Sequence, residues 1–336
     1  MNLDALAKLA GVSVSTVSKA FSGSREVGAA TRERIFALAR ENGMFDKYNK
    51  NRFGKPVVAV ICPEWRSNFY KTILTMLKDE LTARGALMTV SSTDFDAERE
   101  AEYFTYHAFY SKADGIILVG PQGSVENPTR VPAVAIGGPR DGRTLDVVRM
   151  DLWDALRAMV ARLTALGHRR FGFAGERLTV GKRDAFLEAL KEAGLPAGLA
   201  QVRESRDRRF EEAGAECAEA WLRDGDLPTA ILAAYDDVAV GLIKQFRNHG
   251  VRVPEDVSVV GIDDIPEAPY VEPSLSSIRM HVDVACRRAV EIVTQKSKNQ
   301  YYSPREEIVL TAEFIPRDSI GPVRAPENEN FSVGNS

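Results

Sequence analysis

The feature that most constrains the fold is an alternation of short apolar runs with amphipathic segments, which begins at Pro56 and restarts after Asp151. The first series contains the runs VVAVIC, LMTVSS, GIILVG and VPAVAIG. The second contains FGFAG, a short run near Val202, AILAA and VSVVGID. Apolar, β-branched runs separated by helical patterns are typical of parallel strands covered on both faces. The sequence therefore predicts an α/β body of two doubly wound parallel-sheet lobes.

Two such lobes predict a cleft, because ligands of open α/β sheets bind outside the carboxyl ends of the strands. We place lobe 1 at about residues 56–150 and 282–306, and lobe 2 at about 151–281 and 307–318. The stretch 319–336 is polar and rich in Asn, Glu and Pro, so we expect a disordered tail.

The first 53 residues differ from the body in charge. They hold nine Lys and Arg residues against five Asp and Glu residues, a net charge of +4, whereas the rest of the chain carries −7. A basic unit on an acidic body suits a DNA-binding module, because contact with phosphates supplies most non-specific affinity for DNA. A solvated basic face would have the same composition.

The pattern of these residues is more specific than their charge. It predicts an all-α headpiece over 1–45 with helices at Leu3–Ala10, about Val14–Phe21 and about Ala29–Asn42. Gly11 supplies the turn between the first two helices, and a short turn at this place is typical of a helix-turn-helix. One side of the second helix is apolar and can be buried, and the opposite side is small and polar enough to enter a major groove. The residues of the polar side are Val14, Ser15, Ser18 and Lys19.

The run LAKLAGVSVSTVSKAFSGSREVGAATRERI strongly resembles the headpiece of the lactose-repressor/galactose-repressor (LacI/GalR) family of transcription regulators. The resemblance continues through LGHRRFGFAG, AYDDVAVG and VPEDVSVVGIDD to about Asp318, and it extends to the periplasmic sugar-binding proteins. It implies that Val14, Ser15 and Lys19 read base edges. It also implies phosphate contacts for Ser13, Thr16, Ser18, Ser22 and Thr31.

The expected hinge, residues 46–55, departs from the family pattern. The chain reads MFDKYNKNRF, without the family's proline, and Phe53 stands where the family has a leucine that inserts into the minor groove. Phenylalanine also serves as a groove wedge in other proteins. A DNA contact and a packing role for Phe53 both remain open.

Candidate effector-binding residues lie at strand ends of the body and match positions of the family. Asp263 ends the run VSVVGID, where a carboxylate can accept hydrogen bonds from two sugar hydroxyls. Arg183 follows FGFAG and offers a planar fork of donors, with a surface salt bridge as the alternative. Tyr235 replaces a family asparagine and brings a ring into the expected cleft. The other candidates are Glu64, Asn68, Phe69, Tyr70 and Phe210.

Nothing in the sequence indicates an enzyme or a metalloprotein. GxSxG, HExxH, a Walker loop and GxGxxG after a strand are all absent from the sequence, and we interpret His168 as structural. The three cysteines lie far apart without CxxC spacing, so we expect neither zinc nor disulfides. No apolar run is long enough to cross a membrane, and no secretory signal is present. We expect a cytoplasmic protein without metal, cofactor or membrane partner.

These observations predict a sequence-specific transcription regulator, most often a repressor in this family. We expect a homodimer on near-palindromic double-stranded operator DNA, because two recognition helices related by a dyad read two half-sites. Residues 56–318 would bind the effector, a small polar molecule that we expect to be a sugar or sugar derivative, and would form the dimer. The alternative is a cytoplasmic small-molecule-binding protein with weakened or lost DNA binding, and the hinge departures are its only support.

Overall fold

The computed structural model describes residues 2–22, 24, 26–45, 54–111, 113–125, 127, 131–138, 145–195, 200–298 and 304–323. The chain forms two compact units, Met1–Val57 with Gly85–Leu87, and Val58–Arg84 with Met88–Ser336. Within the described ranges, no helix is long and apolar enough to span a bilayer.

The first unit contains three helices at the predicted positions. They are α1 (Leu3–Ala10), α2 (Val14–Phe21) and α3 (Ala29–Glu41). Gly11 ends α1 in a left-handed conformation (φ 63°), which glycine adopts without steric cost. The hydroxyl of Ser13 accepts a hydrogen bond from the backbone N–H of Thr16 and so caps α2. The three helices share one small core around Leu6, Val17 and Ile35, which are fully buried.

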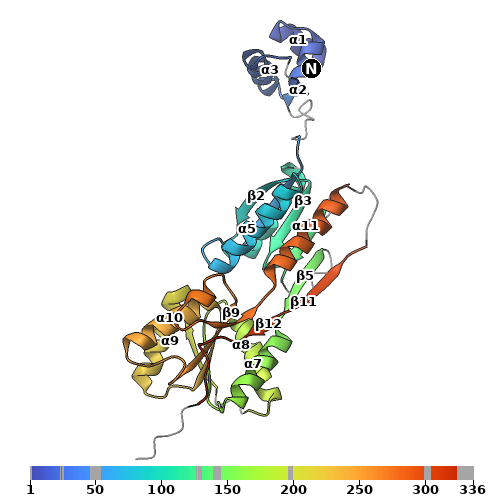
Figure 1. Ribbon diagram of the computed structural model, residues 1–336. Coiled ribbons are helices and arrows are strands. Elements are labelled where there is room, and N and C mark those ends of the chain that lie inside the picture. Colours follow the sequence, from blue (N-terminus) through green and yellow to red (C-terminus); the bar gives the residue numbers. More distant parts are fainter. Residues whose placement is uncertain are drawn as a thin grey trace, which may run out of the picture. The chain divides into compact units, whose positions relative to one another are not determined.

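Lobe 1 of the second unit is a six-stranded sheet in the order β11-β5-β4-β3-β1-β2. Helices α5 and α11 lie side by side on one face (Figure 1), and α6 packs its Phe104 on the other. The strands are β1 (Val57–Cys62), β2 (Leu87–Ser92), β3 (Gly115–Val119), β4 (Ala133–Ile136), β5 (Asp146–Asp151) and β11 (Glu307–Thr311). The helices are α5 (Asn68–Ala83), α6 (Ala97–Thr105), the π-helix η1 (Tyr106–Tyr110) and α11 (Val282–Lys298).

Lobe 2 is a second six-stranded sheet, in the order β12-β10-β9-β8-β6-β7, with α7 and α8 on one face and α9 and α10 on the other. Its strands are β6 (Phe171–Glu176), β7 (Gln201–Ser205), β8 (Ala230–Ala233), β9 (Ser258–Asp263), β10 (Ser276–Arg279) and β12 (Glu313–Ile315). Its helices are α7 (Trp153–Ala165), α8 (Val180–Glu192), α9 (Phe210–Asp224), α10 (Asp236–Asn248) and the 3₁₀ turn η3 (Ala268–Tyr270). The predicted fold class, an all-α headpiece with two parallel-sheet lobes, is confirmed.

The chain crosses between the lobes three times, and the last crossing lies later than expected. We assigned 307–318 to lobe 2, but β11 pairs in parallel with β5 of lobe 1 over five residues. Only after Ala312 does the chain enter lobe 2, where β12 runs antiparallel to β10. Edge-strand pairing depends on a partner far away in the sequence, which a local pattern does not reveal.

The segment after Asp318 also differs from expectation, because its first residues belong to lobe 2. Ser319 is fully buried, and its hydroxyl donates to the carbonyl of Val259 at 2.6 Å. The carbonyl of Gly321 accepts from His168 Nε2 at 2.9 Å, which gives this histidine the structural role we expected. Residues 324–336 of the expected tail and most of the hinge, including Phe53, lie outside the described residues.

Candidate functional site

The candidate recognition surface of the headpiece is one side of α2. Val17, Ala20 and Phe21 are buried, whereas Val14, Ser15 and Ser18 are exposed, as the helical period predicts. Three of the expected phosphate contacts, Ser13, Thr16 and Ser22, are exposed or half-buried. Their hydroxyls already bond within the headpiece, Ser13 Oγ to Thr16 Oγ1 at 2.8 Å and Ser22 Oγ to the carbonyl of Lys19 at 3.1 Å.

Lys19 has a partner that the sequence did not indicate. Its ammonium lies 2.5 Å from the carboxylate of Glu26, in the loop after α2. Both side chains remain substantially exposed, so water and salt screen the pair.

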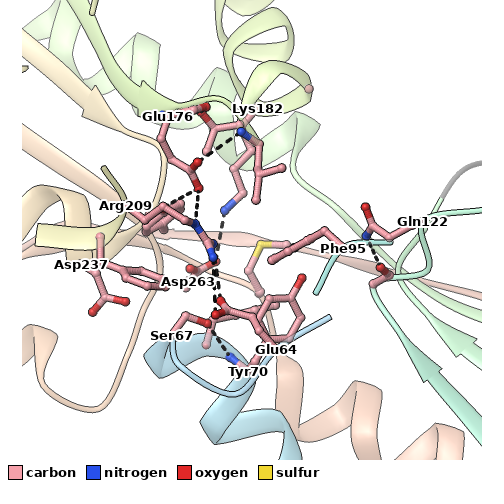
Figure 2. A pocket seen from close by; sticks show the side chains of 18 of the residues that line it. Glu64, Ser67, Tyr70, Phe95, Gln122, Glu176, Lys182, Arg209, Asp237 and Asp263 are labelled. Atoms are coloured by element: carbon pink, nitrogen blue, oxygen red, sulfur yellow. Dashed lines mark hydrogen bonds and ion pairs between the residues drawn. The ribbon is translucent and has the colours of Figure 1, made fainter. Parts of the chain in front are cut away.

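The second candidate site is a cavity of about 670 Å³ between the two lobes of the body. Figure 2 shows side chains from both lobes pointing into it. The cavity lies at the carboxyl ends of β1 and β3 in lobe 1 and of β6, β8 and β9 in lobe 2, as the sheet topology predicts. Six of the eight candidate residues line it. They are Glu64, Phe69, Tyr70, Phe210, Tyr235 and Asp263.

The lobe 1 wall follows β1 and begins α5. The hydroxyl of Ser67 accepts the backbone N–H of Tyr70 at 3.2 Å, which caps α5 and turns its first residues toward the cavity. Burial and the nearby carboxylate of Glu64 raise the pKa of Tyr70, so this residue keeps its proton and remains a donor. Asn68 does not line the cavity. Its amide donates to Asp237 of lobe 2 at 2.7 Å and so joins the lobes.

The lobe 2 wall centres on Asp263 at the end of β9. Its carboxylate is 3.4 Å from the ammonium of Lys182, which also donates to the carbonyl of Ala234 at 2.8 Å. Burial raises the pKa of Asp263 to about 6, although Lys182 opposes the shift. Asp263 also has a positive φ of 112°, which non-glycine residues rarely adopt and which often marks functional sites.

The structure does not bring Arg183 into this cavity. Its guanidinium pairs with Asp184 and, at 2.9 Å, with Glu204, both in lobe 2. The preceding residue, Lys182, points into the cavity instead. Successive residues of a helix are rotated by 100°, so an assignment shifted by one residue places the side chain on a different face.

Tyr235 lines the cavity and makes a specific contact there. Its hydroxyl donates to Glu176 at 2.8 Å, and burial together with this carboxylate raises the pKa of Tyr235. Tyr235, which stands in the place of the family asparagine, therefore positions the carboxylate of Glu176 in the cavity wall.

Several lining residues were absent from the sequence-based set. They are Ser67, Phe95, Gln122, Glu176, Thr179, Lys182, Arg209 and Asp237, among others. Glu176 ends β6 and Gln122 follows β3, so a strict search of strand ends would have found them. Gln122 and Gly123 are in turn held by their backbone N–H groups, which donate to the buried carboxylate of Glu100 at 3.0 and 3.2 Å. Arg209 precedes a helix and carries no such signal.

The described residues contain no cluster of His, Cys, Asp and Glu that could hold a metal ion. Cys62, Cys217 and Cys286 are free and buried, and burial raises the pKa of each thiol, most of all for the last two, to about 12.

Comparison with known proteins finds relatives of both parts of the chain. Residues 2–44 match the family described as bacterial regulatory proteins, lacI family, and residues 160–320 match a periplasmic binding protein-like domain. The HTH-type transcriptional regulator DegA of Bacillus subtilis (strain 168) is 26% identical over 95% of this chain and 97% of its own length.

Two solved structures share the fold over nearly the whole chain. The lac repressor dimer bound to operator and the anti-inducer ONPF is 21% identical, with a TM-score of 0.69, and covers 95% of this chain and 98% of its own. The complex of the transcriptional regulator CelR with cellobiose is 24% identical, with a TM-score of 0.64, and covers 95% and 99%.

A helix-turn-helix unit joined to a two-lobed periplasmic-binding-protein-like body defines a class of DNA-binding transcription regulators. The chain belongs to the LacI/GalR family within that class.

Proposed function

We propose that the protein is a repressor whose affinity for operator DNA is controlled by a sugar or sugar derivative bound between the lobes. The observation that carries the proposal is the cavity of about 670 Å³, which has walls from both lobes. A ligand that touches both lobes can favour one relative orientation of them, and only such differential affinity can shift a conformational equilibrium.

The chemistry of the cavity supports a carbohydrate. The rings of Tyr70, Phe95 and Phe210 offer apolar surface for the C–H face of a sugar, and Asp263 offers acceptor oxygens for hydroxyl groups. Cellobiose is the ligand of the similar regulator CelR. By this similarity we propose that the ligand of this protein is also a polar carbohydrate.

At the DNA, α2 would enter the major groove of each half-site of a near-palindromic operator, with the protein acting as a homodimer. Val14, Ser15 and Lys19 would read base edges. The phosphate contacts would come from Ser13, Thr16, Ser18, Ser22 and Thr31. The lac repressor, which shares the fold, is a dimer on its operator in the matched structure.

The DNA-binding part is tested on duplexes that the wild-type protein selects from a random pool. Lys19→Ala should cost about 1–3 kcal/mol of binding free energy on the selected site and little on random DNA, because a base contact carries the sequence preference. Thr16→Ala, which would lose only a phosphate contact, should weaken both alike. Equal losses on both DNAs for Lys19→Ala would contradict its base-reading role.

The effector part is tested by a thermal-shift screen of neutral sugars, sugar phosphates and purines, because a ligand of the folded state raises the melting temperature. A compound that also changes retention of the selected duplex is an effector. Asp263→Asn should abolish that response while the protein remains folded. Undiminished binding of the same compound to Asp263→Asn, measured by calorimetry, would place the effector elsewhere.

A further inference from the structure

The guanidinium of Arg209 lies inside the cavity and contacts one carboxylate and one aromatic ring from each lobe (Figure 2). In lobe 1, its Nη1 is 3.4 Å from Glu64 Oε2, and its Cζ is 5.0 Å from the ring centre of Phe95. In lobe 2, its Nε donates to Glu176 Oε1 at 3.1 Å, and its Cζ is 4.5 Å from the ring centre of Phe210. A guanidinium suits this environment because it forks between carboxylates and stacks on rings.

Arg209 forms an ion pair with both carboxylates, and Glu176 also accepts a hydrogen bond from Tyr235. Glu64 is 5% exposed and Glu176 is 1% exposed, so neither charge is well solvated by water. Within the described ranges, Arg209 is the only Lys or Arg within 4.0 Å of either carboxylate. Separation of the lobes would take Glu64 away from its cation. A carboxylate that loses its partner while it is still shielded from water is unfavourable, so the ion pair opposes separation.

The backbone at both rings supports a functional role for this arrangement. Phe95 has a φ of 62° and Phe210 a φ of 58°, a left-handed conformation that is rare for bulky residues. Such strain persists only where the surroundings hold it, and it clusters at functional sites. Here the two strained residues come from different lobes and present their rings to the same guanidinium.

From this geometry we propose that Arg209 is a built-in clamp of the effector cavity, which holds the two lobes together through the chain's own side chains. The inference rests on the proposed function only in treating this cavity as the effector site. An effector shifts the equilibrium between two lobe arrangements only through its different affinity for them. If the clamp already favours the closed arrangement in the free protein, an effector that closes the lobes can shift this equilibrium less. Arg209 would therefore set the range of the response.

The test measures lobe separation in the full-length protein with no ligand added. Spin labels on Ala101→Cys, in α6 of lobe 1, and Ala193→Cys, after α8 of lobe 2, report the distance between the lobes by double electron–electron resonance. Both positions are exposed, and the three native cysteines are buried and so protected from the label. We expect Arg209→Gln to broaden the distance distribution and move it to longer distances.

Arg183→Gln is the matched control. It removes the same charge from the same lobe, but its partners Asp184 and Glu204 both belong to lobe 2, so the distribution should not change. Glu64→Gln removes the clamp from the lobe 1 side and should broaden the distribution as Arg209→Gln does. The double variant should add little, because both substitutions break the same contact.

An Arg209→Gln protein that is folded by circular dichroism and keeps the wild-type distribution would overturn the clamp, as would equal broadening in Arg183→Gln. If Arg209→Gln does not fold, Glu64→Gln decides in the same way. Altered distances without any sugar response of DNA binding would leave the clamp standing and contradict the proposed effector control. A sugar response with unaltered distances would do the reverse.

Discussion

At the scale of the residue, the role of a charged side chain depends on the partner that it already has. Lys19 is expected to read bases, yet Glu26 lies 2.5 Å from its ammonium. The loop that carries Glu26 is fixed by Arg32, whose guanidinium donates to the carbonyls of Ser24 and Val27 at 2.5 and 3.2 Å. An exposed pair contributes only about 0–1 kcal/mol, so a DNA acceptor can replace Glu26.

We therefore predict that Glu26→Gln raises affinity for random-sequence DNA. The substitution removes a negative charge beside the recognition helix and the ion pair that holds Lys19 in the wild-type protein, so Lys19 can contact phosphates on DNA that lacks its preferred bases. The plot of log affinity against log salt should steepen by up to about 0.9 for each additional phosphate neutralised. Fluorescence anisotropy across a salt series measures this slope.

Glu41→Gln, at the exposed end of α3, removes the same charge without touching Lys19 and serves as the control for net charge. In a Lys19→Ala background, Glu26→Gln should no longer steepen the slope. The same increase in Glu41→Gln would mean that net charge alone explains the effect.

A second prediction at this scale concerns Asp263, whose pKa burial raises to about 6. The carboxyl group of Asp263 then binds its proton more tightly in the folded state than in the unfolded chain. The contribution of Asp263 to stability therefore falls as the pH rises from about 4 to about 6. A shift of about two pKa units corresponds to about 3 kcal/mol. The unfolding free energy of wild type minus that of Asp263→Asn should fall by about this amount between pH 4 and pH 7. Urea titrations across this range test it, and a constant difference would contradict it.

How far the sequence predicts a site residue depends on how local its position is. Glu64 follows a buried strand closely, Asp263 ends one, and Tyr70 lies in the first turn of the helix after β1, so the topology brings all three to the cavity. Arg183 was expected in the cavity, but its neighbour Lys182 lies there instead. The direction of a side chain on α8 depends on the rotation of the helix about its axis, which a strand end does not fix. Arg209 was missed altogether, since its importance comes from partners in both lobes that are far apart in the sequence.

At the scale of the element, the same distinction separates helices from edge strands. The positions of α1 and α2 agree with the prediction, because the side chains of Asn2 and Ser13 cap their first turns locally and Gly11 ends α1. The assignment of β11 to lobe 1 was not predicted, because its pairing with β5 spans about half of the chain. The close packing of α9 against α10 is another long-range feature. It depends on glycines, whose lack of a side chain lets the two backbones approach.

We predict that Gly241→Ala destabilises lobe 2. A Cβ on Gly241 of α10 would lie 2.0 Å from the carbonyl oxygen of Glu211 in α9, and one on Gly214 of α9 would lie 2.1 Å from that of Val238 in α10. Backbone atoms cannot move aside easily, so we expect a loss of about 1–3 kcal/mol in unfolding free energy. Gly181→Ala in α8 meets nothing within 4 Å and should instead gain about 0.5–1 kcal/mol. Equal urea midpoints for Gly241→Ala and Gly181→Ala would contradict this prediction, because they would show that α9 and α10 can move apart without loss of stability.

At the scale of the whole molecule, the second unit is completed by residues near the end of the chain. The two lobes are built from interleaved segments, and residues 319–323 are the last described residues, which belong to lobe 2. The carbonyl of Ser319 accepts from the backbone N–H of Val259, and its N–H donates to the carbonyl of Ser274, both at 2.9 Å. Its hydroxyl accepts from the backbone N–H of Ser276 at 2.8 Å. Composition alone suggested a disordered tail, because it does not show that a serine will be buried between distant strands.

The last prediction follows from these bonds and compares two truncations. A chain that ends at Asp318 loses Ser319, which leaves buried backbone groups of Val259 and Ser276 without partners. Each such group costs about 1–3 kcal/mol, so lobe 2 should lose several kcal/mol and the melting temperature should fall clearly. A chain that ends at Val323 keeps all of these bonds, including those of Gly321 to His168 and Ser258, and should melt as the full chain does. Scanning calorimetry separates the two cases, and equal melting of both truncations would show that the segment 319–323 does not stabilise lobe 2.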